Sequence, residues 1–218
     1  MRLIFLDIDG VLNNILDHKI SLLLCGEPTE YKVEISQNNF DILKYLTTLT
    51  NSHIVISSSW RKSPMFNDHE NEFVPTKEIE IVEKFKKLFS HFGWDNAPII
   101  GITPNIAGFR GEEVATYLDS ISKIHVIEDY IILDDDSDFI LDKLADLSTK
   151  FLEHSEIDLN KKYSSYWEHQ RLILVNRLVG LAYSDLIEIL KIWAPESDMI
   201  KVHESYQPYI PRYGKKFK

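Results

Sequence analysis

The chain has 218 residues, 44% of them hydrophobic and 27% charged, which fits one globular domain with insertions or one domain with a small accessory element. The formal net charge of −10 argues against a general polyanion-binding surface, although it leaves room for a local phosphate pocket. The single cysteine, Cys25, excludes an internal disulfide bond.

The same features predict the compartment. A chain without internal disulfides suits a reducing environment, where we expect Cys25 to be buried and inert. The chain enters an apolar run directly after Met1 and Arg2, without the pattern of a signal peptide. The longest apolar runs, such as ISLLLC at 20–25, are too short to span a membrane. We therefore expect a cytoplasmic protein with no membrane partner.

Strands are predicted where short apolar runs occur. None of these runs alternates apolar with polar residues, which is typical of a parallel sheet covered on both faces. The runs are LIFLDI (3–8), HIVIS (53–57), YIILD (130–134) and LILV (172–175), with APIIGIT (97–103) as a further candidate.

Helices are predicted between the strands. Residues 37–50 place Ile42, Tyr45, Leu46 and Leu49 on one helical face. The stretch 77–92 has the same periodicity, at Ile81, Val82, Phe85, Leu88, Phe89 and Phe92.

The boundaries of the later helices are also readable. Thr76, after Pro75, is a candidate N-cap for the helix over 77–92. A short helix is predicted over 111–120, and Ser184-Asp185 open a last one, LIEILKIW.

This alternation predicts a Rossmann-like, doubly wound α/β sheet within one domain over 1–195. The segments 14–35, 62–76 and 139–170 fit the pattern least, and we expect them to be flaps or insertions over one sheet edge. Because only about twenty residues (14–35) lie between the first motif and the first helix, we expect a short flap and no large cap. Residues 196–218, which end in YIPRYGKKFK, are expected to be a C-terminal extension.

Acidic and hydroxyl side chains follow three of the predicted strands. Asp7 and Asp9 end the first run, Ser57, Ser58 and Ser59 end the second, and the acidic stretch DDDSD (134–138) ends the third. Ligands of doubly wound sheets bind at the carboxyl ends of the strands, so these side chains gather where a site is expected.

Converging carboxylates repel one another unless a cation compensates them, and an all-oxygen set suits Mg²⁺. A carboxylate such as Asp7, with its charge neutralised, can attack phosphorus and form an aspartyl-phosphate. Asp9, two residues later on an extended stretch, faces the same way and can act as general acid and base. Hydroxyls and one cation would hold the phosphoryl oxygens.

Four stretches together resemble the signatures of the haloacid dehalogenase-like (HAD) phosphohydrolase superfamily. FLDIDGVLN resembles the first, IVISSS the second and YIILDDDSD the fourth, while GFRGEEVATYL supplies a basic residue, Arg110, for the third. Further stretches, SSSWR and LILVNRLVGLAYSDLIEIL among them, look like a bacterial and phage subgroup found with RNA-repair modules and similar to polynucleotide 3′-phosphatases. Gly180-Leu181-Ala182 departs from that subgroup's Gly-Leu-Thr.

The resemblance implies a role for each matching residue. Asp7 would be nucleophile and Mg²⁺ ligand, and Asp9 the general acid and base with its carbonyl on the metal. Asp134 would bind the metal, and Asp135 would share that role or orient a metal-bound water. Asp138 is a secondary candidate for the same centre.

The phosphate-binding residues are less sharply defined. Strand-end logic favours Ser57 as the phosphate-binding hydroxyl, and alignment on Trp60 favours Ser58. Arg110 is the candidate clamp, with Lys123 as its competitor, and Arg61 offers a further phosphate contact.

Structural readings compete with each assignment. An aspartate pair often caps a loop, DDDSD alone reads as a solvated turn, and a lone arginine is usually a surface residue. KKYSSYWEHQR (161–171) reads either as an insertion packed on the sheet edge or as a base-stacking surface. The eight histidines show no spacing that favours zinc.

The expected function is therefore Mg²⁺-dependent phosphomonoester hydrolysis at an open site that admits large substrates such as nucleic-acid ends. The alternatives are a small-metabolite phosphatase or nucleotidase, and a phosphate- or nucleic-acid-binding module without turnover.

Overall fold

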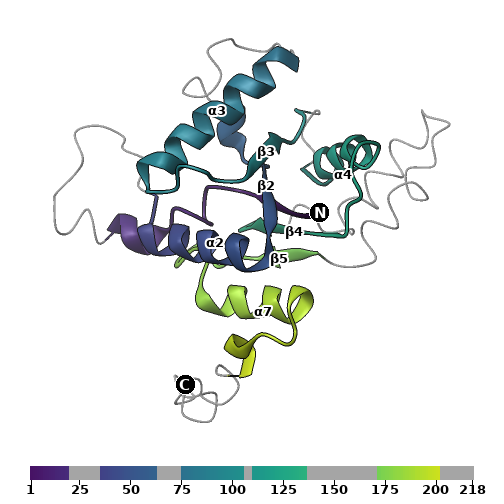
Figure 1. Ribbon diagram of the computed structural model, residues 1–218. Coiled ribbons are helices and arrows are strands. Elements are labelled where there is room, and N and C mark those ends of the chain that lie inside the picture. The colour runs from purple at the N-terminus through teal and green to yellow at the C-terminus, as the bar shows by residue number, and fades with distance from the viewer. Residues whose placement is uncertain (20–34, 63–74, 106–109, 137–170, 202–218) are drawn as a thin grey trace, which may run out of the picture.

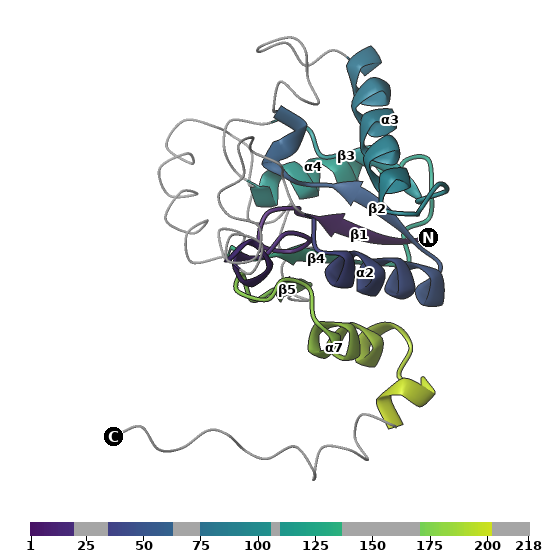
Figure 2. The same ribbon diagram turned by 90° about the vertical axis from the view of Figure 1, so that its left-hand side faces the viewer.

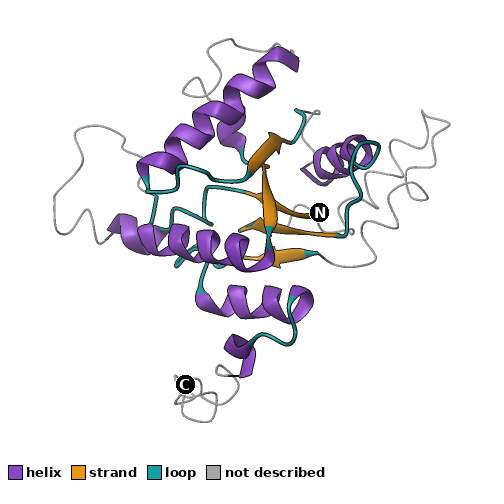
Figure 3. Ribbon diagram, viewed as in Figure 1, coloured by secondary structure: helices purple, strands orange, loops and turns teal. Residues whose placement is uncertain are grey.

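A computed structural model describes residues 1–19, 35–62, 75–105, 110–136 and 171–201 (Figure 1). Within these residues, the centre is a sheet of five strands in the order β3-β2-β1-β4-β5, and each strand is parallel to its neighbours (Figure 3). The strands are β1 (Arg2–Leu6), β2 (Ser52–Ile56), β3 (Ile99–Ile102), β4 (Asp129–Asp134) and β5 (Leu172–Leu174). The predicted parallel α/β sheet is confirmed, with strand boundaries that differ by at most two residues from the apolar runs.

Helices cover both faces of this sheet. They are α2 (Gln37–Thr50), α3 (Pro75–His91), α4 (Arg110–Ile121) and α7 (Tyr183–Trp193), with a 3₁₀ turn, η1, over Ser59–Lys62. Buried side chains of α2, α3 and α7 pack with one set of strand residues, including Ile4 and Leu6. Side chains of α4 pack with the alternate set, including Leu3 and Phe5. Because successive residues of a strand face opposite sides, β1 is buried on both.

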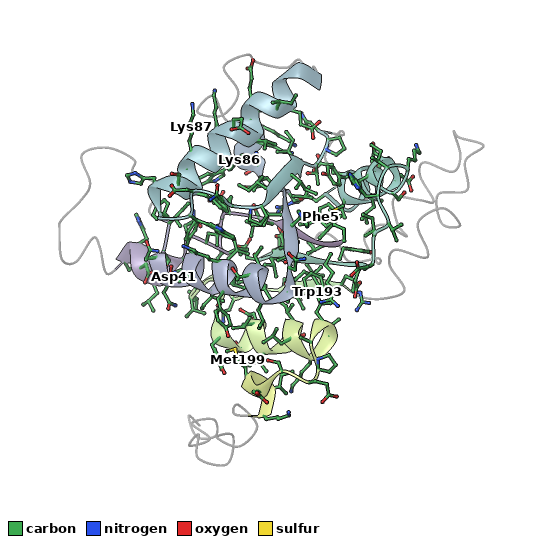
Figure 4. All side chains as sticks on the ribbon, viewed as in Figure 1. Phe5, Asp41, Lys86, Lys87, Trp193 and Met199 are labelled. Atoms are coloured by element: carbon green, nitrogen blue, oxygen red, sulfur yellow. The ribbon has the colours of Figure 1, made fainter. Side chains whose placement is uncertain are left out.

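Aromatic side chains fill both halves of the core. Phe5 makes edge contacts with Tyr117 of α4 and Tyr130 of β4, at centroid distances of 5.8 and 6.0 Å. Figure 4 labels Phe5 at the centre of the fold and Trp193 on α7. The indole N–H of Trp193 donates to Asp129 Oδ2 at 3.0 Å, which ties the last helix to the start of β4.

The register of the sheet brings the carboxyl ends of three strands to one level. Leu6 of β1 is paired with Ile56 of β2 and with Leu133 of β4. The ladder continues one residue further, where the N–H of Asp7 donates to Leu133 O at 3.0 Å and the N–H of Ser57 donates to Leu6 O at 2.8 Å. Figure 2 shows these strands running in the same direction toward one edge of the molecule.

The predicted buried face of α2 is partly wrong. Tyr45 and Leu49 are exposed, while the buried side is centred on Phe40, Leu43 and Leu46. Several polar residues share that side, because their side-chain hydrogen bonds are satisfied there: the hydroxyls of Thr47 and Thr50 donate to carbonyls four residues back, and Asn39 donates to carbonyls of the loop before α7. Apolar periodicity alone could not reveal a buried stripe that includes polar residues.

The other helices follow the prediction with shifted ends. The apolar face of α3 is confirmed, with Ile81, Val82, Phe85 and Phe89 buried and Leu88 and Phe92 packed against them. Thr76 is not its N-cap, since the helix begins at Pro75. A proline at a helix start gives up no hydrogen bond, because its missing N–H would have no partner in the helix.

Several sequence predictions concern residues outside the described part of the chain. These are Cys25, Asp138, most of the insertions at 14–35, 62–76 and 139–170, nearly all of the stretch 161–171, and the chain end from 202. Within the described residues, no helix is long and apolar enough to cross a membrane.

Candidate active site

Three aspartates meet at the carboxyl edge of the sheet. One carboxylate oxygen from each of Asp7, Asp134 and Asp135 lies within 4.8 Å of the others. Asp7 directly follows β1 and Asp134 ends β4, and both are buried. Burying several carboxylates together is costly unless cations offset their charge. The cluster is therefore a place where positive charge is required.

Arg110, the first residue of α4, supplies part of that charge. Its guanidinium faces Asp134 with both terminal nitrogens, Nη1 donating to Oδ1 at 3.2 Å and Nη2 lying 2.8 Å from Oδ2. Nη2 also lies 2.8 Å from Asp7 Oδ2 and donates to Ser57 O at 3.2 Å. This arginine therefore joins the ends of β1, β2 and β4 through one planar group.

Asp135 completes the cluster beside a required glycine. Gly10 has a φ of +73°, and a Cβ built on it would lie 2.3 Å from the Asp135 carboxyl carbon. A side chain at position 10 would therefore push Asp135 out of the cluster. Burial raises the pKa of the Asp135 carboxyl, an effect that Arg177 opposes and the nearby Asp7 charge reinforces.

The donor set fits a small divalent cation. All three candidate ligands are carboxylate oxygens, which Mg²⁺ prefers. With bonds of 2.0–2.1 Å, octahedral Mg²⁺ places its ligand oxygens roughly 2.9 to 4.1 Å apart, so oxygens spread over 4.8 Å reach it with a small inward shift. The cluster could hold one ion and retain positions for water and phosphate.

The two candidate serines differ in their surroundings. Both are fully buried. The Ser57 hydroxyl has no hydrogen-bond partner within the described residues, whereas the Ser58 hydroxyl accepts the backbone N–H of Trp60 at 3.3 Å. A buried hydroxyl without a partner is uncommon and marks a place where a ligand oxygen could bind. This difference favours Ser57, which strand-end logic also favoured.

Asp9 is held by two side chains. The indole N–H of Trp60, from η1, donates to Oδ2 at 2.9 Å, and the amide of Asn13 donates to Oδ1 at 2.8 Å. The amide oxygen of Asn13 in turn accepts the N–H of Gly10 at 2.8 Å. Both carboxylate oxygens are therefore fixed, and with them the plane of the Asp9 carboxyl group.

A buried ion pair ties the second strand end to α4. Arg61 of η1 and Glu113 of α4 are both almost fully buried and form a salt bridge, and Arg61 Nη1 also donates to Ser58 O at 2.6 Å. Burial lowers the pKa of the Arg61 guanidinium, and the charge and hydrogen bond of Glu113 oppose this shift. Because its two terminal nitrogens contact Glu113 and Ser58 O, Arg61 supports the loop rather than presenting these N–H groups to a phosphate.

Lys123 lies far from the cluster. It follows α4 and is exposed, whereas Arg110 begins that helix. The 12 residues of α4 span about 18 Å at 1.5 Å per residue, so the two ends cannot serve the same site. The positions of the two side chains favour Arg110 over its competitor.

No role in the site was predicted from the sequence for four residues of this region. They are Asn13, Glu113, Arg177 and Trp60, the last of which donates a hydrogen bond to Asp9. In the sequence, Trp60 stands out only as the tryptophan that follows three serines in SSSWR. From the sequence alone, Glu113 resembles an ordinary exposed helix residue. No local sequence pattern connects Arg177 with Asp135.

Comparison with known families agrees with this geometry. The model of the HAD domain in Swiss Army Knife RNA repair proteins matches residues 3–182, which include every described residue of the cluster. The chain belongs to this HAD domain family. The sequence-based resemblance is thereby confirmed, together with the fold class that it implied.

Membership of the HAD family supports a hydrolase of the phosphatase kind, and the aspartate cluster is a candidate metal centre for it. No significant match was found among the curated proteins or among the solved structures. The matched region ends at residue 182, so it includes Arg177 but stops just before α7.

Proposed function

We propose that this HAD domain is a Mg²⁺-dependent phosphomonoester hydrolase that forms an aspartyl-phosphate on Asp7 and acts on the 3′-phosphate ends of nucleic acids. The observation that supports this most is the meeting of Asp7, Asp134 and Asp135 beside Arg110. A nucleophile, a set of metal ligands and a cation that can bind phosphoryl oxygens are thus brought to one strand edge.

The reaction proceeds in two displacements. An Asp7 carboxylate oxygen bonds to phosphorus as the bond to the leaving oxygen breaks, and Asp9 gives that oxygen its proton. Asp9, now a carboxylate, takes a proton from water, whose oxygen attacks phosphorus, releases inorganic phosphate and frees Asp7. When bound, Mg²⁺ would neutralise the negative charge of the phosphoryl group and the carboxylates.

The remaining residues hold the phosphoryl group and the metal. Asp134 and Asp135, together with Asp7 and the carbonyl of Asp9, would hold Mg²⁺. Arg110 and the Ser57 hydroxyl bind phosphoryl oxygens. These assignments place every charge close to where it is needed in the transition state.

The choice of substrate rests on the family. This family is the HAD domain of RNA repair proteins, and on that basis we propose nucleic-acid ends as the substrates. An acidic chain, with a net charge of −10, would draw little binding energy from a long polyanion. Recognition would therefore rest on the terminal nucleotides rather than on the whole strand.

A substrate panel tests this function. We expect Mg²⁺-dependent phosphate release from 3′-phosphorylated oligonucleotides, with kcat/KM at least about tenfold above that for 5′-phosphorylated oligonucleotides and for 3′-mononucleotides, and loss of activity in EDTA. A preference for mononucleotides would favour the nucleotidase alternative. Oligonucleotide binding without turnover of any phosphomonoester, p-nitrophenyl phosphate included, would favour a binding module.

The contact between Trp60 and Asp9 predicts a separate kinetic effect. Trp60→Phe keeps an aromatic ring but removes the N–H that fixes Asp9 Oδ2. Because a misplaced acid protonates the leaving group poorly, we expect kcat to fall about 10- to 100-fold with little change in KM. The defect should shrink for p-nitrophenyl phosphate, whose leaving group needs little protonation. An equal loss on both substrates would contradict a role through Asp9.

A further inference from the structure

Arg177 stands at the rim of the aspartate cluster. Its Nε lies 3.4 Å from Asp135 Oδ2, yet its side chain is 68% exposed while that of Asp135 is 11% exposed. An arginine carries five N–H donors in a planar fork. Within the described residues, its side chain contacts Asp135 through Nε, and no contact of its terminal nitrogens is seen. This exposed side chain therefore has donors left for a ligand beside the candidate metal ligands.

The backbone that carries Arg177 is fixed to the segment after Asp9. The N–H of Ile15 donates to Arg177 O at 3.3 Å, and the N–H of Leu16 donates to Leu178 O at 3.0 Å. Asn39 adds hydrogen bonds to the carbonyls of Val179 and Leu181, at 2.9 and 2.7 Å. The guanidinium therefore extends from a well-anchored loop, and its position relative to the cluster is set by the fold.

A glycine makes this anchoring possible. Gly180 has a φ of +70°, and a Cβ on it would lie 2.8 Å from the Asn39 side chain. Asn39 also accepts a hydrogen bond from Asn14 at 2.7 Å, which connects the loop to the turn after the first motif. This network explains why two buried asparagines lie near the strand edge.

Exposed apolar residues lie next to Arg177 along the backbone. Leu178 follows it in the chain, Leu16 is hydrogen-bonded to Leu178 through the backbone, and the two leucines are 56% and 48% exposed. A cation on the same exposed loop as apolar side chains suits a group that carries both an anion and a flat apolar surface. A nucleotide, with its phosphodiester and its base, has both.

We propose that Arg177, with Leu16 and Leu178, forms a subsite for the nucleotide that bears the terminal phosphate, with the guanidinium on the phosphodiester that joins it to the rest of the strand. This inference rests on the proposed function. The terminal phosphate lies at the aspartate cluster, and the next anionic group along the strand meets the terminal nitrogens of Arg177, which bind phosphate oxygens as a pair. The subsite selects a strand over a compact phosphomonoester.

Two substrates separate this role from mere support of Asp135. A 3′-phosphorylated dinucleotide carries the phosphodiester, and p-nitrophenyl phosphate does not. For Arg177→Gln we expect the ratio of kcat/KM for the dinucleotide to that for p-nitrophenyl phosphate to fall at least about tenfold, chiefly through KM. Arg177→Lys should recover part of the ratio, since it restores the charge without the fork. Lys201→Gln, a similarly exposed charge removed beyond α7, should leave the ratio unchanged.

An equal loss of kcat/KM on both substrates, which leaves the ratio unchanged, would mean that Arg177 acts only through Asp135. Wild-type kcat/KM on both substrates would mean that it contacts no substrate. Either result overturns the subsite. Binding of a fluorescent 3′-phosphorylated dinucleotide gives a readout without turnover. If wild-type protein hydrolyses nothing, the proposed function fails, while weaker binding by Arg177→Gln than by Lys201→Gln still supports the subsite and equal binding overturns it.

Discussion

Asp7→Asn is expected to abolish phosphate release, with kcat reduced at least about a thousandfold, or about 4 kcal/mol of transition-state stabilisation. An amide is a poor nucleophile and a weak Mg²⁺ ligand, so the substitution removes both proposed roles of this side chain. The variant should fold, because Asn has nearly the same shape and its oxygen can still accept the N–H of Ile8, which now donates to Asp7 Oδ1 at 2.7 Å. Phosphate release under saturating Mg²⁺ is the measurement.

The control is Asp198→Asn, which makes the same chemical change at a side chain that is 93% exposed. It should retain wild-type activity. Acid quenching of wild-type protein during turnover of a ³²P-labelled substrate should trap protein-bound label, and Asp7→Asn should trap none. Comparable phosphate release by Asp7→Asn and wild type would remove Asp7 as the nucleophile.

Breaking the buried Arg61–Glu113 pair should cause the largest loss of stability. Glu113→Gln leaves the Arg61 charge buried without a full counter-charge, since Lys62, 3.6 Å from Glu113, is itself a cation. Removing one partner of such a pair costs about 3–5 kcal/mol. Urea unfolding should show this loss, whereas Glu83→Gln, which breaks the exposed pair with Lys86, should cost less than about 1 kcal/mol.

A double-mutant cycle tests whether the two charges act as a pair. Arg61→Met and Glu113→Leu should each be strongly destabilising, and the double variant should be clearly more stable than the sum of the two losses predicts. Activity should stay low in the double variant, because η1 and α4 would lose the salt bridge that fixes the positions of Ser58 and Arg110 relative to each other. Additive losses in unfolding free energy would contradict the pairing.

The sheet and its acidic edge could be predicted from the order of the amino acids alone. Continuous apolar runs are readable as buried parallel strands because both faces are covered, and polar residues after such runs must lie at the ligand-binding edge. The register then aligned the residues after Leu6, Ile56 and Leu133, so Asp7, Ser57 and Asp134 became neighbours as expected.

The side chains that contact these groups could be identified only from the folded structure. The contacts of Asp9 with Trp60, of Arg61 with Glu113 and of Asp135 with Arg177 join residues that are distant in the chain, and no local pattern encodes them. The buried polar side of α2 was also unreadable, because hydrogen-bond partners determine whether a polar residue is stable inside. Apolar burial follows local periodicity, whereas the pairing of charged and polar groups depends on which strand ends and helices the folded chain brings together.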